Sequence, residues 1–253
     1  EAPDGWRFAV TARIDEAVAR LKELQREVEL PPTLRPFPEL ALEALYGLAG
    51  EFVRTLEPET EADPVALLMS FHLCFGNVIG RNAHVLVEAD QHFANLFINL
   101  VGETSRGRKG TSFGQARKPM EAIEPEWTKR TLSGASSGEG IIWTVRDPIV
   151  KRQQVREKGR LTSQFEEVIV DPGVDDKRLL LYEGEFAAVL RVLEREGSNL
   201  SALIRLAWDR GDLATLTKNS PARATGAHVS ILGHITRDEL VRHLENTEAA
   251  NGF

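Results

Sequence analysis

The chain has 253 residues, of which 42% are hydrophobic and 27% are charged, and this is an ordinary composition for a soluble globular protein. Its length suits one large α/β domain, with or without a small helical region. A formal net charge of −7 argues against a surface coated with basic residues for nucleic acid, but it does not exclude a local basic loop. Cys74 is the only cysteine, which excludes an internal disulfide and a cysteine-based zinc site and favours a reducing, cytoplasmic compartment.

No apolar run in the sequence approaches the ~18 residues that a membrane span needs. The N-terminus also lacks the cationic and apolar regions of a signal peptide. We therefore expect a cytoplasmic protein without a membrane partner. The sequence starts at Glu1 without a methionine and stops at Phe253, so we expect it to be a piece of a longer protein.

The N-terminal region is predicted to be helical. Residues 13–29 carry apolar side chains at helical spacing on one stripe, with charged residues elsewhere. Four prolines between residues 31 and 38 then predict a linker. The sequence thus indicates an N-terminal helix and proline-rich linker over residues 1–38, separate from the rest of the chain.

Residues 39–83 are predicted to form a helical subdomain. A helical apolar pattern runs from Leu42 to Leu56, and Asp63-Pro64 is typical of an N-cap followed by the first helical residue. The helix expected at 64–80 is largely apolar, so we expect it to be buried and His72 to lie in the core.

From residue 84 onward, short apolar runs alternate with helical patterns, which predicts an α/β sheet flanked by helices. A hairpin is also expected, between 213–217 and 227–232. We predict an α/β core over residues 84–253, truncated at its C-terminal end. Its other expected elements are strands at 84–87, 96–101 and 178–182 and helices at 109–121, 138–146, 184–196 and 236–246.

A glycine-rich segment, GETSRGRKGTS, comes directly after the apolar strand predicted at 96–101. Glycines let backbone N–H groups wrap a phosphate without obstruction by a Cβ, and a helix N-terminus adds unpaired N–H groups. In such a loop Lys109 reaches the β- and γ-phosphates, and Thr111 or Ser112 holds Mg²⁺. The expected nucleotide-binding residues are Gly102, Ser105, Gly107, Arg108, Lys109, Gly110, Thr111 and Ser112.

The spacing of this segment departs from the usual phosphate loop in one place. Arg108 stands between Gly107 and Lys109, where the usual pattern has glycine directly before lysine. Lys109 is followed by Gly110 before the hydroxyl residue, as in adenylate-kinase-like loops. The alignment of this segment with the usual phosphate loop is therefore uncertain by one residue. The structural alternative is a basic, glycine-rich surface turn.

A phosphate-loop enzyme needs a carboxylate at the end of a neighbouring strand to organise Mg²⁺ and water. The apolar strand predicted at 178–182 runs into Glu183 and Glu185. We assign Glu183 as the Walker B residue, with Glu185 as its alternative or partner in holding the metal. Acidic residues at a helix N-terminus are common and provide the structural alternative.

A loop of small residues precedes Glu139, which is a candidate to polarise the attacking water. In the same loop Ser136 or Ser137 is equally suited to capping the next helix. Further along, the apolar strand that starts at Val229 ends in polar residues. His234 or Thr236 could there sense the γ-phosphate, although Thr236 also fits a helix-capping box.

Five blocks of the sequence resemble, in the same order, a family of actinobacterial plasmid, prophage and integrated-element proteins: GETSRGRKGTS, LSGASSGEGIIW, DKRLLLYEGEF, AWDRGDLATLTKNSPARATGAHVSILGHIT and NTEAANGF. Members of that family are P-loop ATPases related to replicative helicases, often found with or fused to primase-polymerase modules. The resemblance extends over residues 38–253. It implies a RecA-like core with Lys109 as the Walker A lysine and Glu183 as the Walker B acid. It also implies further strands and an arginine-bearing region after the last block.

The loop and the resemblance together predict an ATP-hydrolysing, helicase-like motor in the replication of a plasmid, phage or integrated element. ATP and Mg²⁺ are the expected cofactors. Single-stranded DNA, other copies of the chain in a ring and a primase-polymerase are the expected partners. Two alternatives stay open: a small-molecule kinase, suggested by Lys109-Gly110-Thr111, and a non-enzymatic nucleotide-binding scaffold, suggested by the inserted Arg108.

Residues 147–176 are charged and give no clear pattern of a regular element. A basic loop on a ring-forming motor suits a phosphate backbone, whereas a solvated insertion is the structural alternative. Glu157 is the one acidic residue between positions 151 and 160. The basic residues there are Lys151, Arg152, Arg156, Lys158 and Arg160.

Overall fold

The computed structural model describes Arg20 and residues 39–102, 109–157, 160–216 and 222–244. The chain falls into two compact units, Glu1–Leu40 and Ala41–Phe253, and the second unit holds nearly all of the described residues. The helix predicted at 13–29 and the proline-rich linker lie outside the described residues.

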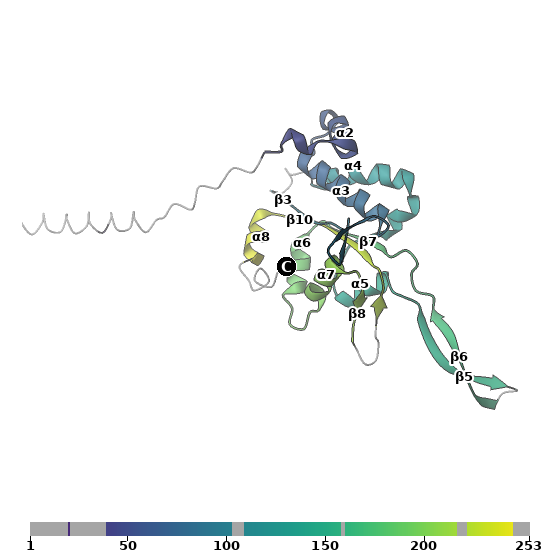
Figure 1. The fold of residues 1–253 in the computed structure, drawn as a ribbon. Coiled ribbons are helices and arrows are strands. Elements are labelled where there is room, and N and C mark those ends of the chain that lie inside the picture. The colour runs from purple at the N-terminus through teal and green to yellow at the C-terminus, as the bar shows by residue number, and fades with distance from the viewer. Residues whose placement is uncertain (1–19, 21–38, 103–108, 158–159, 217–221, 245–253) are drawn as a thin grey trace, which may run out of the picture. The chain divides into compact units, whose positions relative to one another are not determined.

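Among the described residues, a four-stranded parallel sheet forms the centre of the second unit (Figure 1). The strand order is β3-β10-β7-β4. The central strand β10 is buried along its whole length, because strands flank both of its edges and helices cover both faces of the sheet. The strands are β3 (Phe97–Val101), β4 (Thr131–Leu132), β7 (Arg178–Glu183) and β10 (His228–Ile235).

One face of the sheet, called here the α4 face, is covered by helices from the first half of the unit (Figure 1). Helix α3 (Pro64–Ile79) contacts β3, β7 and β10, and α4 (Lys109–Ile123) packs along α3. Helix α2 (Gly47–Leu56) also packs on α3. Residues 41–83 therefore join the same compact unit as the sheet, while residues 39 and 40 fall in the first unit.

The opposite face, called here the α6 face, is covered by α5 (Gly138–Thr144), α6 (Phe186–Leu193) and α7 (Leu200–Asp209). Their apolar side chains form one buried cluster with alternate residues of β7 and β10, among them Leu179, Leu181, Val229 and Ile231. Helix α8 (Arg237–Leu244) comes after β10 and contacts α6.

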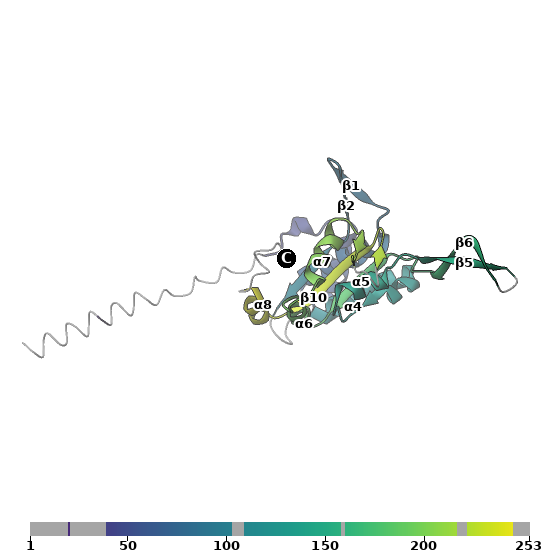
Figure 2. The same cartoon turned by 90° about the horizontal axis from the view of Figure 1, so that it is seen from below.

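The remaining elements are short helices and antiparallel strand pairs. Figure 2 shows two of the pairs, β1–β2 and β5–β6, extending away from the sheet. The pairs are β1 (His84–Val87) with β2 (Asp90–Phe93), β5 (Ile149–Glu157) with β6 (Arg160–Asp171), and β8 (Leu213–Ala214) with β9 (Arg223–Ala224). The 3₁₀ helices are η1 (Leu42–Ala44), η2 (Glu57–Glu59) and η3 (Pro125–Arg130).

The predicted α/β class, a parallel sheet between helices, is confirmed, but one local prediction is wrong. The expected hairpin does not form, because Leu213–Ala214 pairs with Arg223–Ala224 and 228–235 belongs to the parallel sheet. A strand buried on both faces is apolar throughout, so its sequence does not reveal its partner. Residues 147–176, which showed no clear pattern, contain the long β5–β6 hairpin.

The predicted start of α3 is confirmed. The Asp63 carboxylate accepts the N–H groups of Val65 and Ala66 at 2.8 and 3.1 Å, and Pro64 occupies a first-turn position where no N–H is needed. The helix is mostly buried, but His72 is exposed, so its expected place in the core is wrong.

Asn77 ties α3 to the sheet through buried hydrogen bonds. Its side-chain amide donates to the carbonyl of Leu179 at 3.1 Å and to the hydroxyl of Ser230 at 3.0 Å. Its side-chain oxygen accepts the indole N–H of the fully buried Trp127 at 2.8 Å. Buried polar groups are costly when they lose their partners, so this side chain fixes how α3 and η3 sit on the sheet.

We predict that Asn77→Leu lowers the free energy of unfolding by about 3 kcal/mol, because the Trp127 N–H and two sheet acceptors lose their partner. Urea denaturation monitored by tryptophan fluorescence measures the change. The matched control is Asn82→Leu, an exposed residue three positions after the last residue of α3, which should shift stability little. Equal stability of the two variants would contradict this role for Asn77.

Candidate phosphate site at the carboxyl edge of the sheet

The carboxyl ends of β3 and β10 form a topological switch point. After β3 the chain passes to α4, which packs with α3 on the α4 face. After β10 it passes to α8, which contacts α6 on the opposite face. Neighbouring strands whose connections leave toward opposite faces create a crevice at their carboxyl ends, and ligands of open α/β sheets bind in such crevices.

The predicted phosphate loop leaves the sheet at this switch point. The Gly102 N–H donates to the carbonyl of Ile235 at 3.2 Å, so the pairing of β3 with β10 continues to the first residue of the loop. The next described residue, Lys109, begins α4. Three predicted ligands, Ser105, Gly107 and Arg108, lie outside the described residues.

The two candidate metal-binding hydroxyl residues differ in their surroundings. Thr111 is exposed in the first turn of α4. Ser112 is fully buried, and its hydroxyl lies 3.4 Å from that of Ser70 on α3. The structure therefore brings Ser112 into the packing between α3 and α4 and leaves Thr111 open to a ligand.

A row of rings fixes the first turns of α4 over the carboxyl ends of the strands. The ring of Phe113 on α4 stacks on Tyr182 of β7, with centroids 4.4 Å apart. Tyr182 in turn meets His234 of β10 edge-on, at 5.2 Å. A Cβ added to Gly110 would lie 3.6 Å from the Tyr182 hydroxyl. These contacts hold the start of α4 beside β7 and β10.

Tyr182 was not among the predicted site residues. Strand alternation carries the signal that identifies it, since the residue directly before Glu183 must face the opposite side of the sheet. That side is the α4 face. Burial raises the pKa of the Tyr182 phenol, so its hydroxyl stays protonated at neutral pH and is a hydrogen-bond donor next to Gly110.

Glu183 is the last residue of β7 and is only 7% exposed. One carboxylate oxygen, Oε1, accepts the N–H groups of Gly134 and Ala135, each at 2.8 Å. The side chain therefore ties the loop after β4 to the end of β7. Glu185, two residues later, is exposed at the start of α6.

The expectation that Glu183 ends a strand adjacent to β3 is wrong, because β10 lies between β3 and β7. At the usual strand spacing the ends of β3 and β7 are roughly 10 Å apart. Both strands run parallel to β10, so both carboxyl ends open on one edge. The end of β10 therefore lies between the predicted phosphate loop and the Glu183 carboxylate.

The other predicted residues have structural partners. Glu139 accepts a hydrogen bond of 2.6 Å from the Asn199 side chain at the start of α7, and Ser137 caps α5 by accepting the Gly140 N–H at 3.1 Å. His234 is buried against Tyr182 at the end of β10.

Thr236 caps α8 together with Glu239. The Thr236 hydroxyl donates to the Glu239 carboxylate at 2.8 Å, while the Glu239 N–H donates to that hydroxyl at 3.3 Å. The carboxylate also accepts the Thr236 N–H at 3.3 Å, and its hydrogen bonds from the Thr236 hydroxyl and N–H lower the pKa of Glu239. The capping box anticipated as the alternative to a sensor role is thus present.

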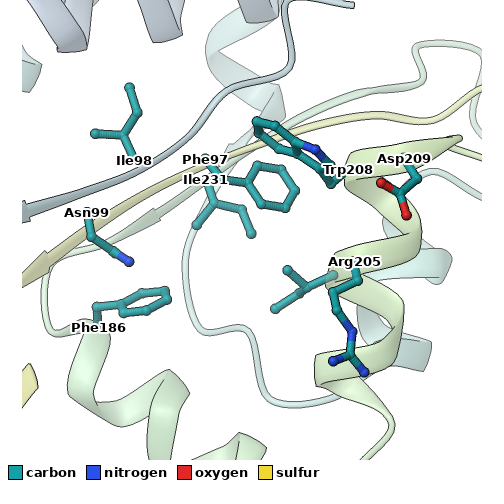
Figure 3. Close-up of a pocket in the computed structure, with 9 residues that line it drawn as sticks. Phe97, Ile98, Asn99, Phe186, Arg205, Trp208, Asp209 and Ile231 are labelled. Atoms are coloured by element: carbon teal, nitrogen blue, oxygen red, sulfur yellow. The ribbon is translucent and has the colours of Figure 1, made fainter. Parts of the chain in front are cut away.

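A separate cavity of about 540 Å³ opens beside β3 on the α6 face (Figure 3). Phe97, Asn99, Phe186 and Trp208 line its walls, and Arg205 contributes its charged group. Glu183 and the described residues of the phosphate loop are not among its lining residues. The cavity is therefore distinct from the candidate phosphate site at the carboxyl edge.

The chain matches no protein-family model, and no curated protein is significantly similar to it. Within the described ranges, no helix is long and apolar enough to cross a membrane. In the same ranges, no three His, Cys, Asp or Glu side chains are grouped to hold a metal ion.

We predict that Glu183→Ala speeds hydrogen exchange at the Gly134 and Ala135 amides by about tenfold or more, because each amide loses a charge-assisted acceptor. Exchange followed by mass spectrometry or NMR gives the rates. Glu185→Ala removes an exposed carboxylate two residues away and should leave both amides unchanged. Unaltered exchange in Glu183→Ala would mean that the carboxylate does not hold the loop.

Proposed function

We propose that the chain is an ATP-binding and ATP-hydrolysing module of the P-loop type with a RecA-like core, and that it works as a helicase-like motor in the replication of a mobile element. The observation that carries the proposal is the course of the chain from β3 through the glycine-rich segment into α4 at the topological switch point. The sequence has a glycine-rich segment there, directly before the N-terminus of α4, and both features favour a polyphosphate.

Lys109 and the loop amides supply the positive groups for the phosphates of ATP. The amides hold the phosphate oxygens, and the lysine ammonium reaches the β- and γ-phosphates. Tyr182 adds a donor beside Gly110. In this proposal the remaining negative charge near the γ-phosphate is neutralised by a metal ion. That ion is held by the carboxylate at the end of β7, on the other side of β10 from the loop.

The residues at this edge fit a magnesium ion. Mg²⁺ is usually held by one or two carboxylates together with substrate phosphates and water. The exposed Thr111 hydroxyl and the carboxylates of Glu183 and Glu185 are the groups that match this chemistry. Bound there, Mg²⁺ would neutralise charge on the β- and γ-phosphates.

Glu183 has two tasks in this proposal. Its Oε1 holds the amides of Gly134 and Ala135, so we assign Oε2 to the metal or to the attacking water. Glu139 remains an alternative for polarising water, and His234 remains the candidate sensor of the γ-phosphate. A neighbouring copy of the chain in a ring supplies the arginine that stabilises the transferred phosphoryl group.

DNA dependence of ATP turnover separates this proposal from its two rivals. A motor responds to single-stranded DNA, a small-molecule kinase needs an acceptor, and a scaffold binds nucleotide without turnover. The resemblance to replication ATPases favours the motor. The kinase requires an acceptor pocket at the phosphates, whereas the 540 Å³ cavity opens beside β3 on the α6 face.

We predict that Lys109→Ala weakens ATP binding by at least about 100-fold, because a cation is removed from the polyphosphate. Titration calorimetry or a fluorescent ATP analogue measures the affinity. The matched control is Lys118→Ala, an exposed lysine on the same helix. If affinity survives in Lys109→Ala, the phosphate site lies elsewhere.

We further predict that Glu183→Gln binds ATP nearly as well as the parent chain but hydrolyses it at least about 100-fold more slowly. The amide keeps an oxygen for the two loop N–H groups but loses the charge that organises metal and water. Phosphate release and nucleotide affinity are measured side by side, with Glu185→Gln as the comparison. Normal turnover in Glu183→Gln together with lost turnover in Glu185→Gln would transfer the role to Glu185.

A further inference from the structure

The β5–β6 hairpin forms a two-stranded ribbon that extends away from the sheet (Figures 1 and 2). β5 has 9 residues, so it is about 30 Å long. The two strands contact each other extensively, and neither has a comparable contact with another described element. A two-stranded ribbon alone is marginally stable in water, so its surface is suited to gaining a partner.

Ionic and hydrogen-bonded contacts fix the base of the ribbon. The Arg146 guanidinium binds both carboxylate oxygens of Asp171, the last residue of β6, at 3.0 Å each. Asp147, just before β5, accepts from Lys177 at 2.9 Å and from the Thr225 hydroxyl at 2.7 Å. Both ends of the ribbon are therefore anchored to the unit that holds the candidate phosphate site.

The basic side chains of the ribbon gather on β5. Lys151, Arg152 and Arg156 are exposed, and none of them has an ion pair with a carboxylate of the described residues. The acidic residues Glu166 and Glu167 lie on β6, and Glu167 is paired in register with Arg152. β5 thus offers three exposed cations without an ion pair among the described residues, although the whole chain is negative.

An aromatic and apolar surface accompanies Arg152, whereas alternation puts its neighbour Lys151 on the opposite face of the ribbon. Phe165 is 53% exposed, and the Arg152 guanidinium lies 5.0 Å from its ring centroid. Val150 and Ile169 are also exposed, and they are paired with each other in register. Alternation along the strands puts these four side chains on one face of the ribbon. Aromatic rings and guanidinium planes are the groups on which unstacked bases stack.

We propose that the β5–β6 ribbon binds single-stranded DNA, with Arg152 and Arg156 of β5 on the phosphates and Phe165 against the bases. The inference deepens the proposed function, since it names the surface through which the motor holds its strand. The binding itself uses the ribbon alone and needs no nucleotide. A ribbon about 30 Å long is compatible with the 4–16 nucleotides that other single-strand sites cover.

Single-stranded DNA fits this surface better than a duplex or a second copy of the chain. A duplex major groove admits a two-stranded ribbon, but it keeps its bases stacked and away from Phe165. A second copy of the chain would bring negative charge to the cations of the ribbon. Its binding would not explain why Phe165 is exposed beside Arg152. Phe165 and Arg152 lie on one face of the ribbon, and this combination favours the unstacked bases of a single strand.

Fluorescence anisotropy of a labelled 15-nucleotide oligothymidine against the full chain without nucleotide, over a series of salt concentrations, tests the proposal. Arg152→Ala and Arg156→Ala should each reduce the slope of log affinity against log salt by about 0.7, and Lys151→Ala on the opposite face should reduce it less. Phe165→Ala should weaken binding about tenfold while keeping the slope. Glu167→Gln should strengthen binding, because it removes a negative charge from the same ribbon.

Arg195→Ala, an exposed cation away from the ribbon, is the control and should change neither affinity nor slope. The proposal would be overturned if affinity and slope stayed unchanged in Arg152→Ala, Arg156→Ala and Phe165→Ala. It would also be overturned by equal duplex binding that is insensitive to Phe165→Ala, or by a change of oligomeric state without a change in DNA affinity. Lys109→Ala keeps the ribbon intact and should still bind the oligonucleotide. A failed ATP site and a failed ribbon therefore give different results.

Discussion

The parallel pairing of β10 between β3 and β7 is the constraint on which the rest of the structure depends. It aligns the carboxyl ends of three strands at one edge, so the start of α4 and the Glu183 carboxylate both lie at the carboxyl edge of the sheet. The ring contacts of Tyr182 with Phe113 and His234 hold that alignment from the α4 face. The burial of Asn77 under the same strands makes α3 the platform on which α4 lies.

Those parts of the fold that depend on local patterns could be predicted from the sequence. Asp63 and Pro64 indicated the start of α3, and the apolar run before Gly102 indicated β3. The partner of β10 could not be predicted, because a strand buried on both faces has no alternation to show which neighbour it takes. The β5–β6 hairpin was missed for a related reason: both of its faces are largely exposed, so polar and apolar residues are not sorted by side.

The candidate site divides in the same way. Lys109, Thr111 and Glu183 could be proposed from strand ends and glycine spacing, which are sequence-local signals. The bond from Glu183 to Gly134 and Ala135 spans about fifty positions, and the contact of Tyr182 with Phe113 spans about seventy. Packing across the sheet decides such pairs. Ser112 could not be told apart from Thr111 in the sequence for the same reason. The two residues are neighbours on α4, yet the Thr111 hydroxyl is exposed and the Ser112 hydroxyl is buried against α3.

Hydrogen exchange across the whole chain, with and without ATP and Mg²⁺, tests the central claim most directly. If backbone amides at the switch point hold the polyphosphate, the segment from Gly102 to Ser112 gains the strongest protection, and the loop tied to Glu183 gains some as well. Protection confined to residues around the cavity beside β3, such as Arg205 and Trp208, with none between Gly102 and Ser112, would contradict the account.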